Sequence, residues 1–449
     1  MLYSRIVNAQ LHITVLCALI LVSSQLIAEE VGELKKPPKT LSLNDALLTI
    51  KGSNLSLVRF DYDALADLDE AESNNYFPDP TLFIAAQNLP TDTFKFNQEP
   101  MTQLRFGIRQ AIPAGDTLSI KHDTLSMKSE MKYTMQDRQW LRLKRSAEQA
   151  WFEAFYWQKT ILILDEDVVF LKQVLDVTQS LYEVGARDQS DILGVELEMI
   201  QLEEKRIDAQ QNFLEFRSQI NILAQENINP WDLDMSFNSF YFQEESIDKL
   251  KVKLEIHPDI MHKSHAIHIS TQNIKLAEQS YAARWSLEAS YGLRSGENSD
   301  SSDRPDFFSA GVSLQIPLFS KAGQDSKVRS AHKRRLSAES ARAAALKNMV
   351  FEYMNVHQKY LKSLEQSKLY ELKILPTLYQ QKNSVLIAYQ SGNFDFNRTL
   401  RVFLKEQNAR LKHQRILVNQ QKMLSKLHYW IPSQARTISS IPSKVGAVQ

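Results

Sequence analysis

The sequence predicts a mainly α-helical protein with a small antiparallel β part, built from two similar halves. Three observations lead to this fold class. Glycine and proline are scarce, with 12 and 14 among 449 residues. Apolar residues recur over long stretches in steps of three and four, and one motif occurs twice. Because tight turns and short strands need glycine and proline, their scarcity indicates long helices instead.

Composition also excludes several classes of function. The 53 basic residues balance 53 acidic ones, so the formal net charge is zero and nothing favours a nucleic-acid partner. The basic run at 327–335 contains no interleaved aromatic residue and is typical of a solvated helix face. No phosphate-binding loop, dinucleotide fingerprint or catalytic elbow occurs. We therefore expect neither an enzyme nor a cofactor.

Residues 1–28 have the layout of a secretory signal peptide. Arg5 gives a basic start, residues 13–22 are apolar, and Ala28 offers a small residue for cleavage. The apolar run is too short to span a bilayer, and no later stretch is long enough either. Cys17 follows Leu16, where a lipoprotein signal would need a small residue, so lipidation is not expected. The exported chain would contain no cysteine, which excludes disulfides and thiolate chemistry.

The motif Tyr-x-x-Gly-x-x-Asp-x-x-x-x-Leu occurs once in each half at a constant offset. Its matched pairs are Tyr182 and Tyr389, Gly185 and Gly392, Asp188 and Asp395, and Leu193 and Leu400. This self-similarity predicts a tandem duplication of about 200 residues. The predicted domain boundaries are a linker at 29–42, a first repeat at 43–230, a linker at 231–245, a second repeat at 246–432 and a flexible tail at 433–449.

Each repeat is expected to contain one long helical hairpin. The first long helix is expected to run from Ser119 to Val184, about 100 Å, with an apolar seam typical of a coiled coil. The seam consists of Trp140, Leu143, Ala147, Ala150, Ala154, Trp157, Ile161, Leu164, Val168, Leu171, Leu175 and Thr178. Pro376 should kink or divide the corresponding rod of the second repeat.

A β-hairpin is expected in front of each long helix, at about 80–113 and about 285–317. Apolar and polar residues alternate in these segments, and each strand has about the length that crosses a bilayer when tilted. Four strands cannot close a barrel, and an open edge is not viable in lipid, so closure would require several copies of the chain. Two or three copies are both compatible with the sequence. A soluble two-hairpin sheet under a helical layer is the alternative.

Taken together, the signal peptide, the paired hairpins, the long helices and the doubled motif resemble the TolC family of outer-membrane efflux proteins. The resemblance covers roughly residues 40–432. It implies a homotrimer whose twelve-stranded barrel lies in the outer membrane of a Gram-negative cell and continues as a helical tunnel into the periplasm. The implied partners are a periplasmic membrane-fusion adaptor and an inner-membrane pump of the resistance-nodulation-division (RND) type.

The substrate class implied by the resemblance rests on one loop. Residues 88–103 look like the heavy-metal branch of these channels. A multidrug or type I protein-secretion exit duct is the alternative within the class. A soluble periplasmic coiled-coil adaptor or scaffold is the alternative of another class.

The doubled motif is itself a helical hairpin turn. A glycine can end one helix in the left-handed conformation, and an aspartate three residues later can cap the returning helix. The turns would then form the periplasmic mouth and contact the adaptor. The candidate contact residues are Val184, Gly185, Asp188, Leu193, Gly392, Asp395 and Leu400. A purely structural role in turning the chain is the alternative.

The resemblance also implies candidates for a closed mouth. Asp191 and Tyr389 match an acid and a tyrosine that form part of the family's lock, whereas Phe394 stands where the family has an arginine. The lock would therefore be weaker or differently wired. Asp191 also lies in the first turn of the expected returning helix, where an acid is favourable anyway.

Arg398 and Arg401 stand where the family has two inner aspartates. If both arginines face the lumen of a trimer, the usual cation preference of the mouth would be lost or reversed. Alternatively, both face solvent or form ion pairs outside the lumen.

The histidine cluster offers only weak metal candidates. His262 and His265 share a helix face and could hold a soft or borderline metal ion. Ordinary polar positions after a helix start at His257-Pro258 are the simpler interpretation.

Overall fold

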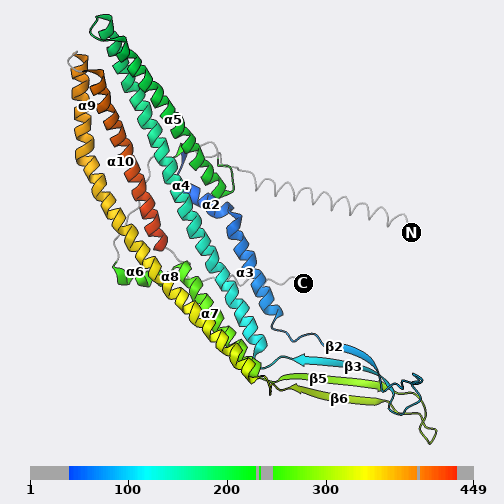
Figure 1. The fold of residues 1–449 in the computed structure, drawn as a ribbon. Helices are drawn as coiled ribbons and strands as arrows, with labels where there is room; N and C mark the ends of the chain where they lie inside the picture. The colour runs from blue at the N-terminus through cyan, green and yellow to red at the C-terminus, as the bar shows by residue number, and fades with distance from the viewer. Residues whose placement is uncertain (1–39, 229–231, 234–245, 392–394, 432–449) are drawn as a thin grey trace, which may run out of the picture.

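The computed structural model describes residues 40–228, 232–233, 246–391 and 395–431. It is an elongated molecule in which long helices occupy one end and a narrow sheet the other (Figure 1). The predicted signal peptide, the predicted tail, most of both predicted linkers, Gly392 and Phe394 lie outside the described residues.

Both predicted hairpins are confirmed, and they join into one four-stranded antiparallel sheet of order β2-β3-β5-β6. The strands are β2 (Thr81–Gln87), β3 (Gln103–Ile112), β5 (Arg284–Leu293) and β6 (Phe307–Gln315). The hairpins meet along β3 and β5, where Phe106 lies opposite Tyr291. Because β2 and β6 each have one partner among the described strands, the sheet has two open edges.

The first half is organised around a helix of 67 residues, α4. Its helices are α2 (Leu43–Ser53), α3 (Leu55–Ser73), α4 (Thr117–Glu183) and α5 (Gln189–Ala224). The predicted seam is confirmed, since Leu143, Ala147, Leu164 and Leu171 are all buried. The steps of three and four bring these side chains to one side of the rod, which packs against its neighbours.

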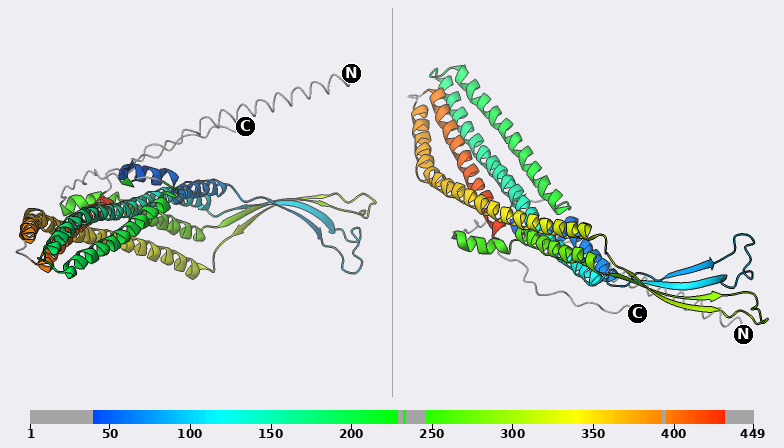
Figure 2. Two further views of the ribbon diagram at one scale, coloured as in Figure 1. Left: turned by 90° about the horizontal axis from the view of Figure 1, so that it is seen from above. Right: turned by 60° about the horizontal axis from the view of Figure 1, so that its bottom comes forward.

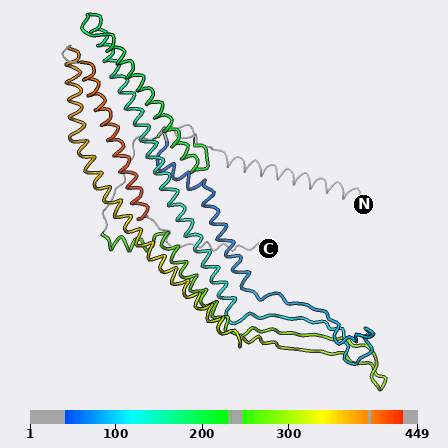
Figure 3. The backbone as a smooth tube through the Cα atoms, in the orientation of Figure 1, coloured from blue at the N-terminus to red at the C-terminus, as the bar shows by residue number. Residues whose placement is uncertain are grey.

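The second half repeats the order of the first: short helices, two strands and a long helical hairpin. Its helices are α6 (Ile247–Glu255), α7 (Pro258–Glu278), the 3-10 turn η1 (Gln279–Tyr281), α8 (Lys321–Leu369), the π turn η2 (Tyr370–Ile374), α9 (Leu375–Gln390) and α10 (Phe396–Trp430). Figure 3 shows both helical hairpins ending at the same end of the molecule, far from the strands. A duplication as the origin of this repeated order stays a prediction.

Pro376 divides the second rod as predicted. The ring lacks an N–H and would crowd the carbonyl of Leu372 in a regular helix. The chain widens into the π turn Tyr370–Ile374 immediately before the proline, and α9 begins at Leu375. The proline therefore sits near the start of a new helix, where its missing donor costs little.

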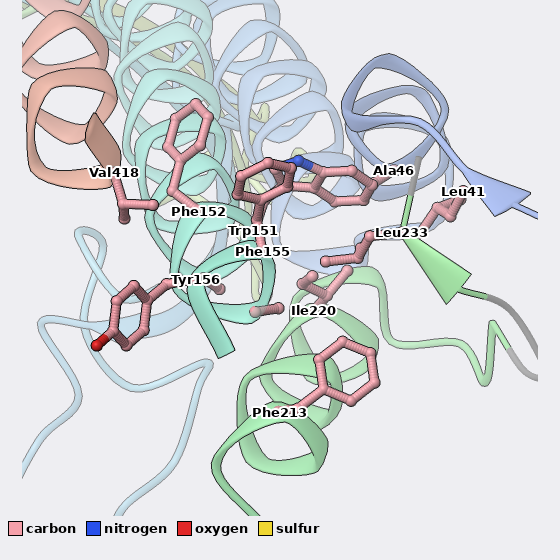
Figure 4. Packing of buried hydrophobic residues seen from close by; sticks show 12 residues of the cluster. Leu41, Ala46, Trp151, Phe152, Phe155, Tyr156, Phe213, Ile220, Leu233 and Val418 are labelled. Carbon is pink, nitrogen blue, oxygen red and sulfur yellow. The ribbon is translucent and has the colours of Figure 1, made fainter. Parts of the chain in front are cut away.

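Two short segments predicted as linkers pair with each other instead. β1 (Thr40–Leu41) runs parallel to β4 (Asp232–Leu233). Leu41 and Leu233 are buried in the cluster that surrounds Trp151. Figure 4 shows these side chains closing one side of the core beside α4. Burial of the two leucines gives these segments a fixed place in the fold.

Helix α4 forms the centre of the helical part. Buried aromatic residues Trp151, Phe152, Phe155 and Tyr156 succeed one another along it and pack against α5 and α10. The two hairpins, α4 with α5 and α9 with α10, lie side by side in both views of Figure 2. Among the described residues, no helix is long and apolar enough to cross a membrane.

Candidate functional surfaces: the helical tips and the two sheet faces

The first helical tip is a regular helix termination built on glycine. Gly185 has φ +73°, and its N–H donates to the Tyr182 carbonyl at 2.9 Å. The next N–H, of Ala186, donates to Leu181 at 2.8 Å. This pair of bonds is a Schellman motif. A Cβ at Gly185 would meet nothing within 4 Å, so the backbone angle, and not crowding, favours glycine.

The returning helices begin at the two expected aspartates. Asp188 is the N-cap of α5 and has extended backbone angles. Asp395 is the N-cap of α10, and its carboxylate accepts a hydrogen bond from the Arg398 N–H at 2.8 Å. Both aspartates thus occupy the N-cap position, but only the Asp395 side chain makes a capping hydrogen bond.

The candidate contact residues differ in exposure. Val184 is 76% exposed and Leu193 is 56% exposed, so both are accessible at the first tip. Leu400 is partly buried and packs against the cluster of Tyr389 and Phe396. Its position suits packing between helices better than contact with a partner.

Tyr389 is fully buried and joins the second hairpin to α4. Its hydroxyl lies 2.7 Å from Thr178 Oγ1. Thr178 donates its own hydroxyl proton to the Val174 carbonyl at 2.7 Å, so Tyr389 is the donor in the bond between them. Asp191, the acid implied by the resemblance, does not take that bond within this chain. The partner Thr178 was not predicted, because it lies in a seam otherwise read as apolar packing.

Asp191 lies half-buried at the start of α5, close to two other acids. Burial raises its pKa, the Arg187 guanidinium opposes this, and Asp188 and Asp395 add to the rise. Arg187 also lies 5.3 Å from the centre of the Tyr389 ring. Asp191, Arg187 and the buried Tyr389 of the second hairpin thus lie close together. The sequence suggested Asp191 and Tyr389 but not Arg187, and the Tyr389 hydroxyl bonds to Thr178.

Arg398 and Arg401 both lie on the exposed side of α10. The intervening Thr399 is buried, as are Val402 and Phe403, which face the helical core. Neither arginine is therefore used to build the core of the chain. Their orientation toward a lumen stays a prediction.

A series of polar contacts, which the sequence did not reveal, connects α4 to α10. Glu153 accepts from Arg415 at 2.7 Å and from Lys422 at 2.6 Å. Asp167 accepts from Gln407 at 2.7 Å and from Arg410, which also donates to Glu166 at 2.8 Å. These partners lie far apart in the sequence. In the sequence alone, the acids are therefore visible only as charged positions that interrupt the apolar pattern of α4.

The two central acids of this series have opposite pKa shifts. Burial opposes the charge of Glu153, but hydrogen bonds from Lys422 and Arg415 outweigh it and lower the pKa. Burial raises the pKa of Asp167 despite the nearby Arg410 guanidinium. The surroundings of Glu153 therefore favour its charged form, whereas those of Asp167 favour its neutral form.

The sheet has one apolar face and one polar face. Apart from Gln110, the large side chains of one parity are apolar, and all of the following except the half-buried Leu104 are exposed: Leu82, Ile84, Leu104, Phe106, Ile108, Trp285, Leu287, Tyr291, Leu293, Phe308, Val312 and Leu314. Phe308 is 73% exposed and Leu82 is 78% exposed. A surface of this kind is costly in water and is suited to contact with lipid.

The opposite face carries the charged side chains of the strands. Glu288 accepts from Arg105 at 2.6 Å and from Arg109 at 2.7 Å. The Phe83 ring lies between these arginines and directly above Gly107, where a Cβ would come within 2.3 Å of the ring. Any larger residue at this position would therefore force the Phe83 ring to move.

His262 and His265 lie on α7. Burial lowers the pKa of His262 to about 4 and lowers that of His265 as well. Within the described residues, no group of three or more His, Cys, Asp or Glu side chains is arranged to hold a metal ion.

Comparison with known proteins finds solved structures with the same architecture. No protein-family model and no curated protein matches the sequence. The outer-membrane channel OprN matches with a TM-score of 0.71 and 16% identity, over 87% of this chain and 89% of its own. CusC, whose structures concern folding and transmembrane channel formation, matches with a TM-score of 0.72 and 14% identity, over 87% and 91%. The Campylobacter jejuni outer-membrane channel CmeC matches with a TM-score of 0.68 and 13% identity, over 87% and 85%. The chain thus has the TolC-like fold of outer-membrane channels.

Proposed function

We propose that this protein is the outer-membrane exit duct of a tripartite efflux system. The observation that carries the proposal is the sheet, which has an exposed apolar face, a polar face and two open edges. Open edges are not viable in lipid, so neighbouring copies must pair β2 with β6. Three copies give a closed barrel of twelve strands with lipid outside and water inside.

The helices offer a second surface for the neighbouring copies. Helix α5 carries exposed apolar residues at intervals of seven: Leu193, Ile200, Ile207 and Leu214. A repeat of seven is the spacing of a coiled-coil seam. In a homotrimer this seam packs against the next copy, and the helices together enclose a tunnel that continues the barrel.

The partners follow from this placement. With the sheet in the outer membrane, the two helical tips lie at the far, periplasmic end (Figure 1). A periplasmic membrane-fusion adaptor docks there and connects the duct to an inner-membrane RND-type pump. The chain supplies a path and no chemistry. We also propose that residues 1–28 direct export of the chain and that the exported chain carries no lipid anchor.

Heavy-metal ions are the substrate class predicted from loop 88–103, with organic compounds or secreted protein as alternatives. We would compare a strain lacking this chain with its parent for sensitivity to copper, silver, zinc, cobalt and cadmium, and to dyes, detergents and antibiotics. Hypersensitivity that the wild-type chain restores is the expected result. Unchanged sensitivity to every compound would contradict an efflux duct.

Two further outcomes separate the substrate classes. Selective sensitivity to metals would support the heavy-metal branch. Sensitivity to the organic compounds alone would make the metal prediction wrong and leave the duct intact.

A further inference from the structure

All charged side chains of the four sheet strands lie on one face. They are Arg105 and Arg109 on β3, and Arg284 and Glu288 on β5. Pairing of Arg109 with Glu288 fixes the shared parity, and alternation along β5 places Arg284 on the same face. β2 and β6 contribute no charge. Three arginines against one glutamate leave this face with a net charge of +2 in each chain.

Glu288 orients the guanidinium groups without neutralising the face. Its carboxylate accepts Arg105 Nη2 at 2.6 Å, and Arg109 Nε and Nη2 at 2.9 and 2.7 Å. Arg105 also donates through Nε to Ser290 at 2.7 Å. These bonds fix both planes, and Nη1 of neither arginine donates a hydrogen bond to another described residue. One carboxylate between two guanidinium groups leaves an excess positive charge.

An aromatic ring completes the arrangement. The guanidinium carbons of Arg105 and Arg109 lie 5.3 and 5.8 Å from the centre of the Phe83 ring. Arg109 remains the most accessible of the paired groups, with 56% of its side chain exposed against 26% for Arg105 and 18% for Glu288. An apolar ring beside an oriented guanidinium group suits an organic anion, which has both a charge and an apolar body.

We infer that this face is an anion-attracting section of the channel and that the exported substrates include organic anions. The inference rests on the proposed function, because the barrel must close with this face inward. Three copies would then place nine arginines and three glutamates around one lumen, a net charge of +6. A pore lined by one sign of charge concentrates ions of the opposite sign and repels free divalent metal ions, so this face favours the organic alternative over the heavy-metal substrate class.

A graded charge series tests the inference. The full-length channel is purified, inserted in planar bilayers and measured for its reversal potential across a potassium chloride gradient. Glu288→Gln should shift the potential toward greater chloride preference. Arg109→Gln should shift it the other way, and Arg109→Gln with Arg284→Gln further still. Arg59→Gln, an exposed arginine on α3 outside the sheet, is the matched control and should leave it unchanged.

The outcomes separate this inference from the proposed function. Unchanged sensitivity of the deletion strain to every compound would overturn the duct itself. Conductance with one reversal potential across the whole series would overturn only the anion-attracting section. The series is repeated with Arg398→Ala and Arg401→Ala, so that charge at the mouth cannot hide a change in the barrel. A monotonic shift in either background supports the anion-attracting section of the channel.

Discussion

At the scale of single residues, the tip glycine and the buried tyrosine contribute in different ways. Gly185 has a left-handed backbone conformation, and the space around its Cα is open. Only the backbone angle therefore limits which residue can stand at this position. Tyr389 is constrained by its surroundings, because its hydroxyl is buried and bonded to Thr178. A substitution at Gly185 can therefore probe partner contact with little disturbance to the core.

We predict that Gly185→Val and Gly185→Asn both abolish transport while the yield of trimer stays at the wild-type level. Valine is strained at this angle by about 1–2 kcal/mol, whereas asparagine tolerates it. Drug or metal survival measures transport, and native electrophoresis measures the trimer. If Gly185→Asn transports normally and Gly185→Val does not, the glycine serves only to turn the chain.

At the scale of elements, the contact between α4 and α10 is held by charged groups as well as by apolar packing. Glu153 and Asp167 on α4 each bind side chains of α10. Their pKa values move in opposite directions, since hydrogen bonds from Lys422 and Arg415 outweigh burial at Glu153 and burial prevails at Asp167. Lowering the pH should therefore destabilise this interface through Glu153 and stabilise it through Asp167.

The sign for Glu153 can be worked out and tested. Its folded pKa lies below the ordinary value of 4.5, so its contribution to stability is present above that value and is lost as the pH falls through the folded pKa. Wild type should therefore lose more stability than Glu153→Gln as the pH falls from about 7 to about 3. Loss of helical circular dichroism on heating measures this.

Asp167→Asn is the control of opposite sign. Because the folded pKa of Asp167 is raised, protonation relieves a burial cost in the wild type as the pH falls. The Asn variant lacks that relief and should lose more stability in acid than the wild type. Equal acid sensitivity of all three proteins would contradict this description of the interface.

At the scale of the whole molecule, much of the fold was predictable because periodicity reports which face of an element is buried. The α4 seam and the strand parities came directly from the order of apolar residues. The pairing of β1 with β4 did not, because two residues in each strand carry no period. The partners of Glu153 and Tyr389 also depend on which helices become neighbours, which local patterns do not determine.

Placement of the molecule in a membrane is tested with two adjacent residues of β6. Val312 lies on the apolar face and is 64% exposed, and Ser313 lies on the polar face. A lysine facing lipid near the midplane costs about 2–4 kcal/mol, whereas one facing a lumen is tolerated. Val312→Lys should therefore be lost from carbonate-washed outer membranes, and Ser313→Lys should remain.

The wild-type chain should also resist carbonate extraction. Release of the wild type into the soluble fraction, or equal behaviour of both lysine variants, would favour a soluble periplasmic scaffold over a barrel.

The π turn at Tyr370–Ile374 changes which side of the second rod faces its neighbours above and below the turn. A π turn inserts one extra residue, and each residue of an α-helix advances the side-chain direction by about 100°. Below the turn, α8 contacts α7 and α10; above it, α9 contacts α10. The turn therefore rotates the side-chain directions of α9 relative to those of α8. A heptad pattern that continues from α8 into α9 has one extra residue at the turn. Deleting that residue would aim a different side of the upper helix at α10.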